Sequence, residues 1–523
     1  MNLLKATGTI GGLTLISRVL GLVRDSLFAR YVGAGFASDA FLVAFRLPNM
    51  FRALFAEGAF ASAFIPMFNQ KVADPDGQGL ADGLLFAEQA LAVLLPVLLA
   101  MTIALEVFAW PVTLVLSGHF HGVSAGEFAF AVTLSRYTIP YLMLISLVSL
   151  FGGILNSLQK FWVNAAAPIL LNLTLIAALL LFHNHDPLAT ARNQAIAVSV
   201  SGALQLLWLG WACRLNGISL RLRWPRLNPE VRRLMSLILP AAAGAGAAQI
   251  NLVISTALAA SLLDHGSVTY IYIADRLNQL PLGLIGIGLG TVLLPTISRQ
   301  LGSGDDLAAL DTQNRGLELA LLLTLPATTA LVVCGEPIAA ALFGYGRYTA
   351  MDTHMTAQAL AAFSIGLPSY ILVKVLTPGF YARQDTRTPV RFALISIAVN
   401  LLGNLLLIMP LHHVGPPLAT AIASTVNVWM LYRELGRRGH FIADARLRRR
   451  APRLLFAALA MGAVLWRGQD LIAPYVHGSW AIRFAALAAL VSAGMLVYGL
   501  ATIVLGAFSR DDIALLLRRR RSS

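Results

Sequence analysis

The sequence predicts an all-α polytopic membrane protein with about fourteen transmembrane helices. Hydrophobic residues make up 57% of the 523 residues, charged residues only 12%, and the mean hydropathy is +0.73. An average soluble domain is roughly 45–50% apolar and 25% charged. Apolar runs of about 20 residues, enough to cross a hydrocarbon core of ~30 Å, recur from end to end. No long segment alternates with a period of two, so the spans must satisfy their backbone hydrogen bonds as helices rather than as barrel strands.

Hydropathy locates each predicted span, and Gly, Pro and charged residues mark where the spans end. The predicted spans are 6–32, 36–68, 83–109, 127–158, 160–183, 190–214, 230–262, 268–299, 314–335, 350–380, 388–409, 413–436, 452–468 and 480–507.

The distribution of charge predicts the orientation. The net charge of +14 alone is compatible with a nucleic-acid partner, but Lys and Arg concentrate in one set of alternate loops and tails, which excludes that class. The positive-inside rule then places both termini in the cytoplasm, with the chain in an inner membrane. Arginine runs at 446–450 and 518–521 are expected to contact anionic membrane lipids. Cys213 and Cys334 are isolated in apolar surroundings and form no metal or redox motif.

Weak internal repetition predicts two six-helix lobes. Arg46-Leu-Pro-Asn, Gly58 and Pro66 recur as Arg276-Leu-Asn-Gln, Gly286 and Pro295. Gly153, Gln159, Asn172 and Gly217 recur as Gly379, Gln384, Asn400 and Gly439. Because each half holds an even number of spans, these are parallel repeats. We therefore expect an N-terminal lobe at 1–217, a C-terminal lobe at 218–440, and two further helices with a basic cytoplasmic tail at 441–523.

Some basic residues remain inside the predicted spans once the loops are accounted for. They are Arg18, Arg24, Arg46, Arg52, Arg136, Arg276 and Lys374. A charge at mid-membrane costs ~2.5–3.5 kcal/mol on insertion scales, so such a set is expected to face a wet cavity and to have a function. Arg18 lies ~20 Å along its helix from Lys5, near the bilayer centre, and Arg52 is equally deep from the other side. Arg136 and Lys374 lie nearer the span ends, where snorkelling to the interface is an alternative.

Acidic residues in the same spans offer partners for these cations. Arg18 and Asp25 lie seven residues apart and share a helix face, as do Asp39 and Arg46. One interpretation is therefore a set of interhelical salt bridges, since buried charges are normally paired. Arg24 and Arg52, however, fall on a different face from these obvious partners. A surplus of positive charge deep in the membrane favours the other interpretation, that these arginines bind an anionic substrate.

The use of arginine rather than lysine indicates which anionic groups the substrate carries. A guanidinium group offers a planar fork that matches phosphate or carboxylate oxygens bidentately. A pyrophosphate presents enough oxygens for three or four such forks.

Several motifs resemble the MurJ (MviN) family of lipid II flippases. They are Ser17-Arg-Val-Leu-Gly-Leu-Val-Arg-Asp25, Ser38-Asp-Ala-Phe41, Arg46-Leu-Pro-Asn49, Arg52, Phe55-Ala-Glu-Gly-Ala-Phe60 and Ala274-Asp-Arg-Leu277. The resemblance implies the fold of the multidrug/oligosaccharidyl-lipid/polysaccharide exporter superfamily, with two six-helix lobes in a V and two C-terminal helices. It also implies a transporter rather than an enzyme, one that moves undecaprenyl-pyrophosphate-linked disaccharide pentapeptide outward across a bacterial inner membrane for peptidoglycan synthesis.

The resemblance also implies the site residues. Substrate-binding positions fall on Arg18, Arg24, Arg52, Arg276, Asp39 and Asn49. Orienting or gating positions fall on Asp25, Glu57, Asp275 and Gln279. Some relatives have an acid where this chain has Gln279, so an ionic gate there is not expected. Where some relatives show a sodium site, the corresponding helices here offer amides and hydroxyls such as Asn251, Asn400 and Asn404, which does not support sodium coupling.

We expect alternating access, with Asp39 and Glu57 competing for the arginines to release the substrate. No cofactor is expected, and the energy source is either the membrane potential or a coupling ion. Lipid II and other cell-wall synthesis proteins are the expected partners. A drug or cation antiporter would favour acids in the cavity, and a membrane glycosyltransferase would carry its chemistry in large outer loops. The longest such loop, around 110–126, has only scattered groups.

Overall fold

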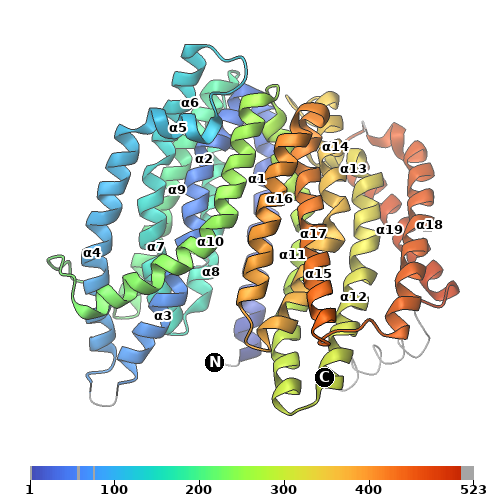
Figure 1. Cartoon of the computed structure of the whole chain (residues 1–523). Coiled ribbons are helices and arrows are strands. Elements are labelled where there is room, and N and C mark those ends of the chain that lie inside the picture. The colour runs from blue at the N-terminus through green and yellow to red at the C-terminus, as the bar shows by residue number, and fades with distance from the viewer. Residues whose placement is uncertain (1–2, 56–58, 75–76, 477, 508–523) are drawn as a thin grey trace. The chain divides into compact units, whose positions relative to one another are not determined.

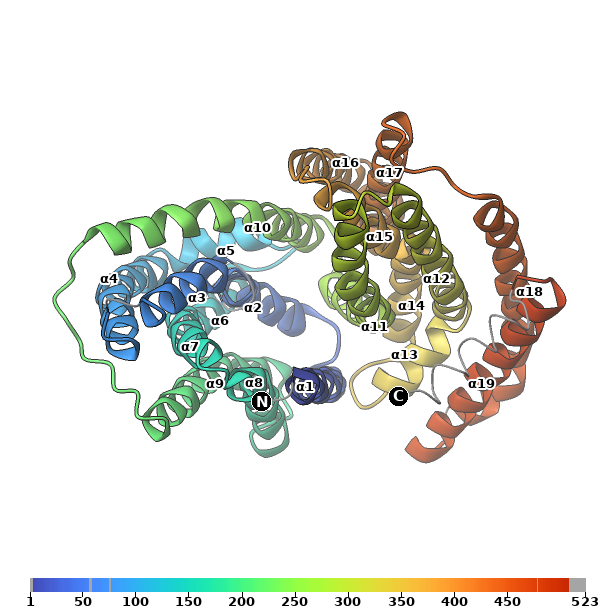
Figure 2. The same cartoon turned by 90° about the horizontal axis from the view of Figure 1, so that it is seen from below.

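The computed structural model describes residues 3–55, 59–74, 77–476 and 478–507. These residues form α-helices joined by short turns, with no strand among them, which confirms the predicted all-α class. Contacts divide the chain into two compact units, Met1–Thr269 with Gly346–Tyr348, and Tyr270–Tyr345 with Thr349–Ser523. Figures 1 and 2 label their helices.

The first unit holds ten helices of the described chain: α1 (Leu3–Val32), α2 (Phe36–Phe55), α3 (Ala59–Val72), α4 (Leu80–Val107), α5 (Ala109–Ser117), α6 (Ala125–Thr138), α7 (Pro140–Ser157), α8 (Phe161–Leu181), α9 (Pro187–Leu215) and α10 (Pro229–Leu262). The helix α11 (Ser267–Gly302) begins in the first unit and continues into the second. The second unit continues with α12 (Asp306–Val333), α13 (Gly335–Phe343), α14 (Ala350–Ile365), α15 (Leu367–Tyr381), α16 (Arg387–Leu411), the 3-10 turn η1 (His412–Val414), α17 (Gly415–Arg437), α18 (Ala445–Val476) and α19 (Trp480–Val504).

Local sequence explains where many of these helices begin. Ser124 and Glu127 form a capping box at the start of α6, and Thr349 and Asp352 form another at α14. Asn228 accepts a hydrogen bond from Val231 N at the start of α10, where Pro229 occupies the first helical position. These side chains satisfy backbone N–H groups that have no partner within the helix.

The helices follow the predicted spans closely, with two kinds of difference. Two predicted spans are each divided into two helices, 127–158 into α6 and α7 and 350–380 into α14 and α15, while α2 and α3 within 36–68 flank residues 56–58, which lie outside the described chain. The division between α6 and α7 falls at Pro140, which lacks the N–H that would continue the hydrogen-bond ladder. In addition, α5 and α13 occupy segments that the sequence predicts as loop or span end, because nine residues are too few for a distinct hydropathy signal.

Eleven segments of the described chain are long and apolar enough to cross a membrane. One of them, 387–437, contains both α16 and α17. The helices α1 and α10 have 30 and 34 residues but are not among the eleven segments. The chain is therefore a multi-pass membrane protein, and fourteen spans stay a prediction.

The compact units differ from the predicted domain boundaries. The division lies at 269/270 rather than 217/218, because α10 packs against α2, α3 and α5 of the first unit. In addition, α18 packs along α12 and α19 packs against α13, so these two helices belong to the second compact unit. The sequence repeat indicates where the second copy begins along the chain. The contacts of α10 show which compact unit this helix joins.

Backbone geometry supports the repeat itself. Gln159 and Gln384, which correspond in the repeat, both adopt positive φ, 59° and 61°. Each donates its N–H three residues back, to Asn156 O at 3.0 Å and to Tyr381 O at 2.9 Å. The pair Gly217 and Gly439 behaves in the same way, with φ of 74° and 69°. Left-handed residues that end a helix at matching places indicate that the two halves share one backbone design.

A buried glutamate also recurs. Glu88 on α4 accepts hydrogen bonds from Arg221 N at 2.9 Å and Arg223 Nε at 2.6 Å. Glu318 on α12, 8% exposed, forms ion pairs with Arg315, Arg446 and Arg450. Each glutamate thus fastens the chain segment that follows α9 or α17.

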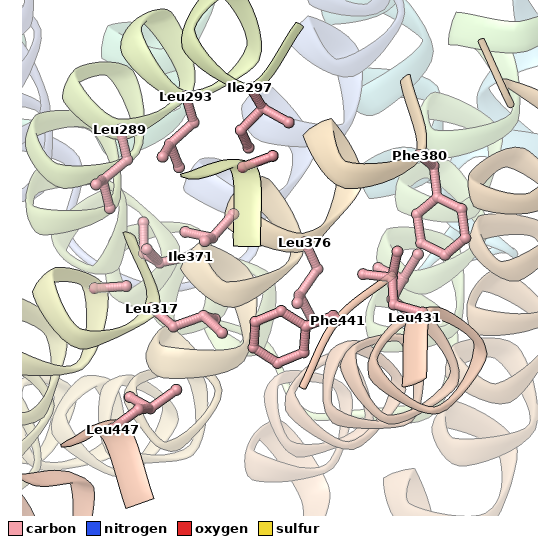
Figure 3. Packing of buried hydrophobic residues seen from close by; sticks show 14 of the residues in the cluster. Leu289, Leu293, Ile297, Leu317, Ile371, Leu376, Phe380, Leu431, Phe441 and Leu447 are labelled. Carbon is pink, nitrogen blue, oxygen red and sulfur yellow. The ribbon is translucent and has the colours of Figure 1, made fainter. Parts of the chain in front are cut away.

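The core of the second unit is apolar (Figure 3). Leu289, Leu293 and Ile297 project from one face of α11 at helical spacing and pack with residues of α12, α15 and α17, including Leu317, Leu376 and Leu431. This packing holds α11, which carries Asp275 and Arg276, in a fixed register within its unit.

A substitution at Gly346 can test how closely the short segment 346–348 packs against the first unit, to which it belongs. Its φ is +63°, and a Cβ there would meet the carbonyl oxygen of Arg30. Gly122 has a similar φ, +67°, with open space around it, so it is a matched control. A left-handed L-residue costs roughly 1–2 kcal/mol at either position, and overpacking adds about 1–3 kcal/mol at Gly346 alone. Gly346→Ala should lower the thermal midpoint of the purified protein more than Gly122→Ala, and equal shifts would contradict the close packing at Arg30.

Candidate substrate-binding site

The helix α1 carries two of the predicted arginines. Arg18 lies near the middle of this 30-residue helix, ~22 Å from either end at 1.5 Å per residue. Its side chain is exposed and forms no ion pair with the residues that the structure describes. Arg24, by contrast, is only 6% exposed.

Arg24 is the centre of a buried polar network. Its Nε and Nη2 donate to Asp25 Oδ1 at 3.0 and 2.6 Å, and its Nη1 donates to Asn172 Oδ1 at 3.2 Å. Asn172 Nδ2 in turn donates to the carbonyl oxygen of Ser17 at 2.9 Å. The network fixes the guanidinium and ties α1 to α8.

This geometry corrects the sequence argument about Arg24. Helical periodicity pairs Asp25 with Arg18 and leaves Arg24 on another face, whereas the structure pairs Asp25 with Arg24. Neighbouring residues diverge at Cβ, but the long arginine side chain spans that divergence. Arg24 is therefore not part of an unneutralised surplus, and the orienting role predicted for Asp25 stays a prediction.

On α2, Asn49 holds Arg52. Nε and Nη2 of Arg52 both donate to Asn49 Oδ1, at 3.1 and 3.0 Å, across one helical turn. Arg46 Nη2 donates to Thr256 Oγ1 of α10 at 2.7 Å. Both acceptors are neutral, so they orient a guanidinium group without themselves cancelling its charge.

Asp39 acts on α11 rather than on an arginine. Its side chain is 2% exposed, and its oxygens accept from Gly266 N at 2.7 Å, Thr269 N at 2.9 Å and Thr269 Oγ1 at 2.6 Å. Since α11 begins at Ser267, the carboxylate of α2 caps the N-terminus of another helix, where the helix dipole also favours negative charge. All of these residues belong to the first unit.

In the second unit, α11 positions the remaining site residues. Arg276 Nε and Nη2 donate to the hydroxyl of Tyr272 at 3.1 and 3.0 Å, and its guanidinium lies over the same ring, 5.2 Å from the centroid. Gln279 Nε2 donates to Asp275 Oδ2 at 2.6 Å. An acid at 279 would instead place two like charges four residues apart on one helix.

The structure thus brings together Arg24 with Asp25, Arg52 with Asn49, and Asp275 with Gln279. It does not pair Asp39 with Arg46, because Gly266 and Thr269 occupy the carboxylate of Asp39. Glu57 lies outside the described residues, so its competition for arginines stays a prediction. The substrate-binding and gating roles of the whole set also stay predictions.

Sequence reasoning missed several partners of the site residues. Tyr272 lies four residues before Arg276, a spacing that could have revealed the contact. Asn172 appears in the repeat pattern, but nothing in the sequence connects it with Arg24. Thr256 and Thr269 lie more than 200 residues from Arg46 and Asp39, respectively, so only the fold reveals these contacts.

The cap formed by Asp39 gives a direct prediction. In Asp39→Asn, one carboxylate oxygen becomes an NH2 group that cannot accept from Gly266 or Thr269. Losing such an acceptor in a buried site costs about 1–3 kcal/mol, so the first turn of α11 should open more often. Hydrogen exchange at the 266–269 amides of the full-length protein should accelerate, whereas Ser38→Ala, which keeps the carboxylate, should change it less. Unchanged exchange in Asp39→Asn would show that the cap does not hold this turn.

Known proteins resemble this chain over most of its length. A family model described as Lipid II flippase MurJ matches residues 28–486. The probable lipid II flippase MurJ of Rhizobium tropici is 40% identical over 530 residues, covering 100% of this chain and 98% of the relative. The lipid II flippase MurJ of Burkholderia cenocepacia is 37% identical over 474 residues, covering 89% and 90%, respectively.

Solved structures agree on the fold. A lipid II flippase MurJ in an inward closed conformation superposes with a TM-score of 0.77 at 24% identity, covering 94% of this chain and 97% of that one. An inward-facing MATE family multidrug transporter of the MOP superfamily gives a TM-score of 0.65 at 15% identity, covering 81% and 94%. These matches confirm the predicted transporter fold. With the family model and the relatives above, they lead to one conclusion: the chain belongs to the lipid II flippase MurJ family.

Proposed function

We propose that this protein is a lipid II flippase. It moves undecaprenyl-pyrophosphate-linked disaccharide pentapeptide from the cytoplasmic to the periplasmic leaflet of a bacterial inner membrane, by alternating access. Family membership over residues 28–486 supports the activity, since relatives of 37–40% identity carry that name. The activity is transport, so no covalent chemistry is asked of the site.

One observation carries the proposal. Arg18 presents an exposed guanidinium at the middle of a membrane-length helix, without an ion pair among the described residues. A charge at that depth is tolerated where it lines a wet cavity and serves a substrate or ion. The pyrophosphate of the substrate is anionic and matches the planar fork of arginine, which also explains the choice of arginine over lysine.

The other site residues support this role. Arg24, Arg52 and Arg276 are each fixed by a neighbouring amide, carboxylate or hydroxyl group, so their forks need little reorganisation to meet a ligand. We assign substrate binding to Arg18, Arg24, Arg52, Arg276, Asp39 and Asn49. We assign orientation or gating to Asp25, Glu57, Asp275 and Gln279.

The transport cycle needs an affinity for the substrate that differs between its conformational states, and an energy source. The arginines replace water around the pyrophosphate in one state and must release it in the other, which requires differential affinity between states. The membrane potential is a suitable source, since each elementary charge that crosses it is worth about 2.3 kcal/mol per 100 mV. A coupling ion is the alternative. Sodium is not favoured, because this position offers amides rather than carboxylates: Asn400 Nδ2 donates to Thr420 Oγ1, and Asn404 Nδ2 donates to Asn400 Oδ1.

The proposed orientation places both termini in the cytoplasm. Arg448, Arg449 and Arg453 are exposed in the first turns of α18, where anionic lipid headgroups would complement them. The second arginine run, 518–521, lies outside the described residues. Other cell-wall synthesis proteins are proposed partners.

The experiment measures outward exposure of labelled lipid II in cells depleted of their own flippase. Expression of this protein should restore exposure. Arg18→Ala should reduce the rate by about 10–100-fold, the equivalent of a charge-assisted hydrogen bond of 1.5–3 kcal/mol. The control is Arg467→Ala, which removes an exposed arginine that lies over Trp466 on α18.

The outcomes separate the activity from the residue assignment. Failure of the wild-type protein to restore exposure would overturn the proposed activity. Full activity of Arg18→Ala at normal abundance and thermal midpoint would remove Arg18 from the site while leaving the activity intact. Equal losses in Arg18→Ala and Arg467→Ala would point to a general effect of positive charge.

A further inference from the structure

A polar cavity lies within the second unit, away from the predicted site residues. Its volume is about 720 Å³, and it is largely open to solvent. Polar side chains on its wall are Ser298, Asp306, Tyr381, Arg383, Gln384 and His440. They come from the end of α11, the start of α12, the end of α15 and the segment after α17. These are loop ends that carry arginine, so the predicted orientation places the cavity on the cytoplasmic side.

Two left-handed turns shape the wall. Gln384, with φ of 61°, ends α15, and Asp385 N donates to Phe380 O at 3.1 Å. Gly439, with φ of 69°, ends α17, and His440 N donates to Leu435 O at 2.9 Å. The residue before the first turn is Arg383, and the residue after the second is His440. The backbone therefore fixes where both side chains start.

The first repeat has the same two turns but different side chains. Gln159 and Gly217 adopt the corresponding positive φ values, 59° and 74°. The residue before Gln159 is Leu158, and the residue after Gly217 is Ile218, which is only 2% exposed. Two apolar residues in one half thus correspond to an arginine and a histidine in the other. Since the apolar pair is compatible with this backbone, the fold does not require the cations.

Arg383 and Asp306 are the charged residues of the cavity wall. Burial lowers the pKa of Arg383, and Asp306 opposes this shift only in part. Arg383 Nη1 donates to the carbonyl oxygen of Gly379 at 2.9 Å, which holds the guanidinium in place. The neighbouring cation Arg438 is engaged by Asp385 at 2.8 Å and Glu434 at 2.7 Å.

His440 responds to the same groups. Burial lowers the pKa of His440, as do Arg383 and Arg438, while Asp306 acts in the opposite direction. An anion bound beside His440 would favour the protonated imidazole, which then donates a hydrogen bond. Affinity would therefore be strongest at low pH and decline as pH rises through the pKa of the bound state, with proton uptake on binding.

We propose that this cavity is an anion-binding site for a phosphate group, held by Arg383 and His440. Ser298 and Gln384 add hydrogen-bond donors, and Asp306 also lines the cavity and acts electrostatically on both Arg383 and His440. The phosphate belongs either to a soluble phosphorylated molecule or to a lipid headgroup. The site is separate from the one that binds lipid II and does not depend on the proposed transport.

The test uses the full-length protein and sulfate as the probe. The charge of sulfate does not change over the pH range in which histidine titrates. Calorimetry in detergent micelles should show saturable binding that strengthens as pH falls from 8 to 5.5, roughly across the histidine range. Arg383→Leu should weaken it about tenfold or more, as expected for a lost charge-assisted pair. His440→Ile should weaken binding and abolish its pH dependence. Both variants install the residue of the first repeat, and their thermal midpoints without sulfate verify folding.

Arg391→Ala is the matched control, since Arg391 is an exposed arginine of α16 that does not line the cavity. It should leave sulfate binding unchanged within about twofold. Sulfate binding is then compared in nanodiscs with and without phosphatidylglycerol. Weaker sulfate binding in the presence of phosphatidylglycerol indicates that the site takes a lipid headgroup, and equal binding indicates a soluble phosphate. Lack of saturable binding to both sulfate and phosphatidylglycerol would overturn the proposal. So would an equal loss in Arg391→Ala and Arg383→Leu.

Discussion

The cost of placing a guanidinium group at membrane depth is the constraint on which the rest of this structure depends. Insertion scales put that cost at ~2.5–3.5 kcal/mol for each charge, so every such arginine needs polar surroundings. Within its own unit, the protein supplies them from side chains: Asp25 and Asn172 for Arg24, Asn49 for Arg52, and Tyr272 for Arg276. Arg18 is exposed at mid-helix and forms no ion pair with the described residues, so it is available to an external anion.

The repeat shows how one backbone design carries different chemistry. Matching left-handed turns end α7 and α15, and α9 and α17, while a buried glutamate recurs on α4 and α12. The site arginines are unequally shared, since α1 and α2 supply Arg18, Arg24 and Arg52, and α11 supplies Arg276. Side chains diverge where function demands it, whereas turns and anchors persist because they hold each copy together.

Hydropathy alone predicts most of the helices, because the lipid core selects long apolar segments independently of tertiary contacts. Short helices such as α5, and the break at Pro140, depend on local geometry that a hydropathy window averages away. Charge at depth predicts the arginines of the candidate site and the family resemblance predicts its other residues, but neither predicts their partners. The contact of Asp39 with Thr269 spans 230 residues, and Arg24 pairs with its neighbour against the helical-face argument. Such contacts depend on side-chain length and tertiary packing, which periodicity does not encode.

The most direct test of the central claim is the distance between the Arg18 guanidinium carbon and the phosphorus atoms of bound lipid II. Solid-state NMR can measure it through 13C–31P dipolar coupling in the membrane-embedded protein. If Arg18 binds the pyrophosphate, the coupling should correspond to about 4–5 Å, as for a hydrogen-bonded guanidinium–phosphate pair. Absence of coupling to Arg18 in a sample with stoichiometric lipid II would contradict the claim that this mid-membrane arginine binds the pyrophosphate.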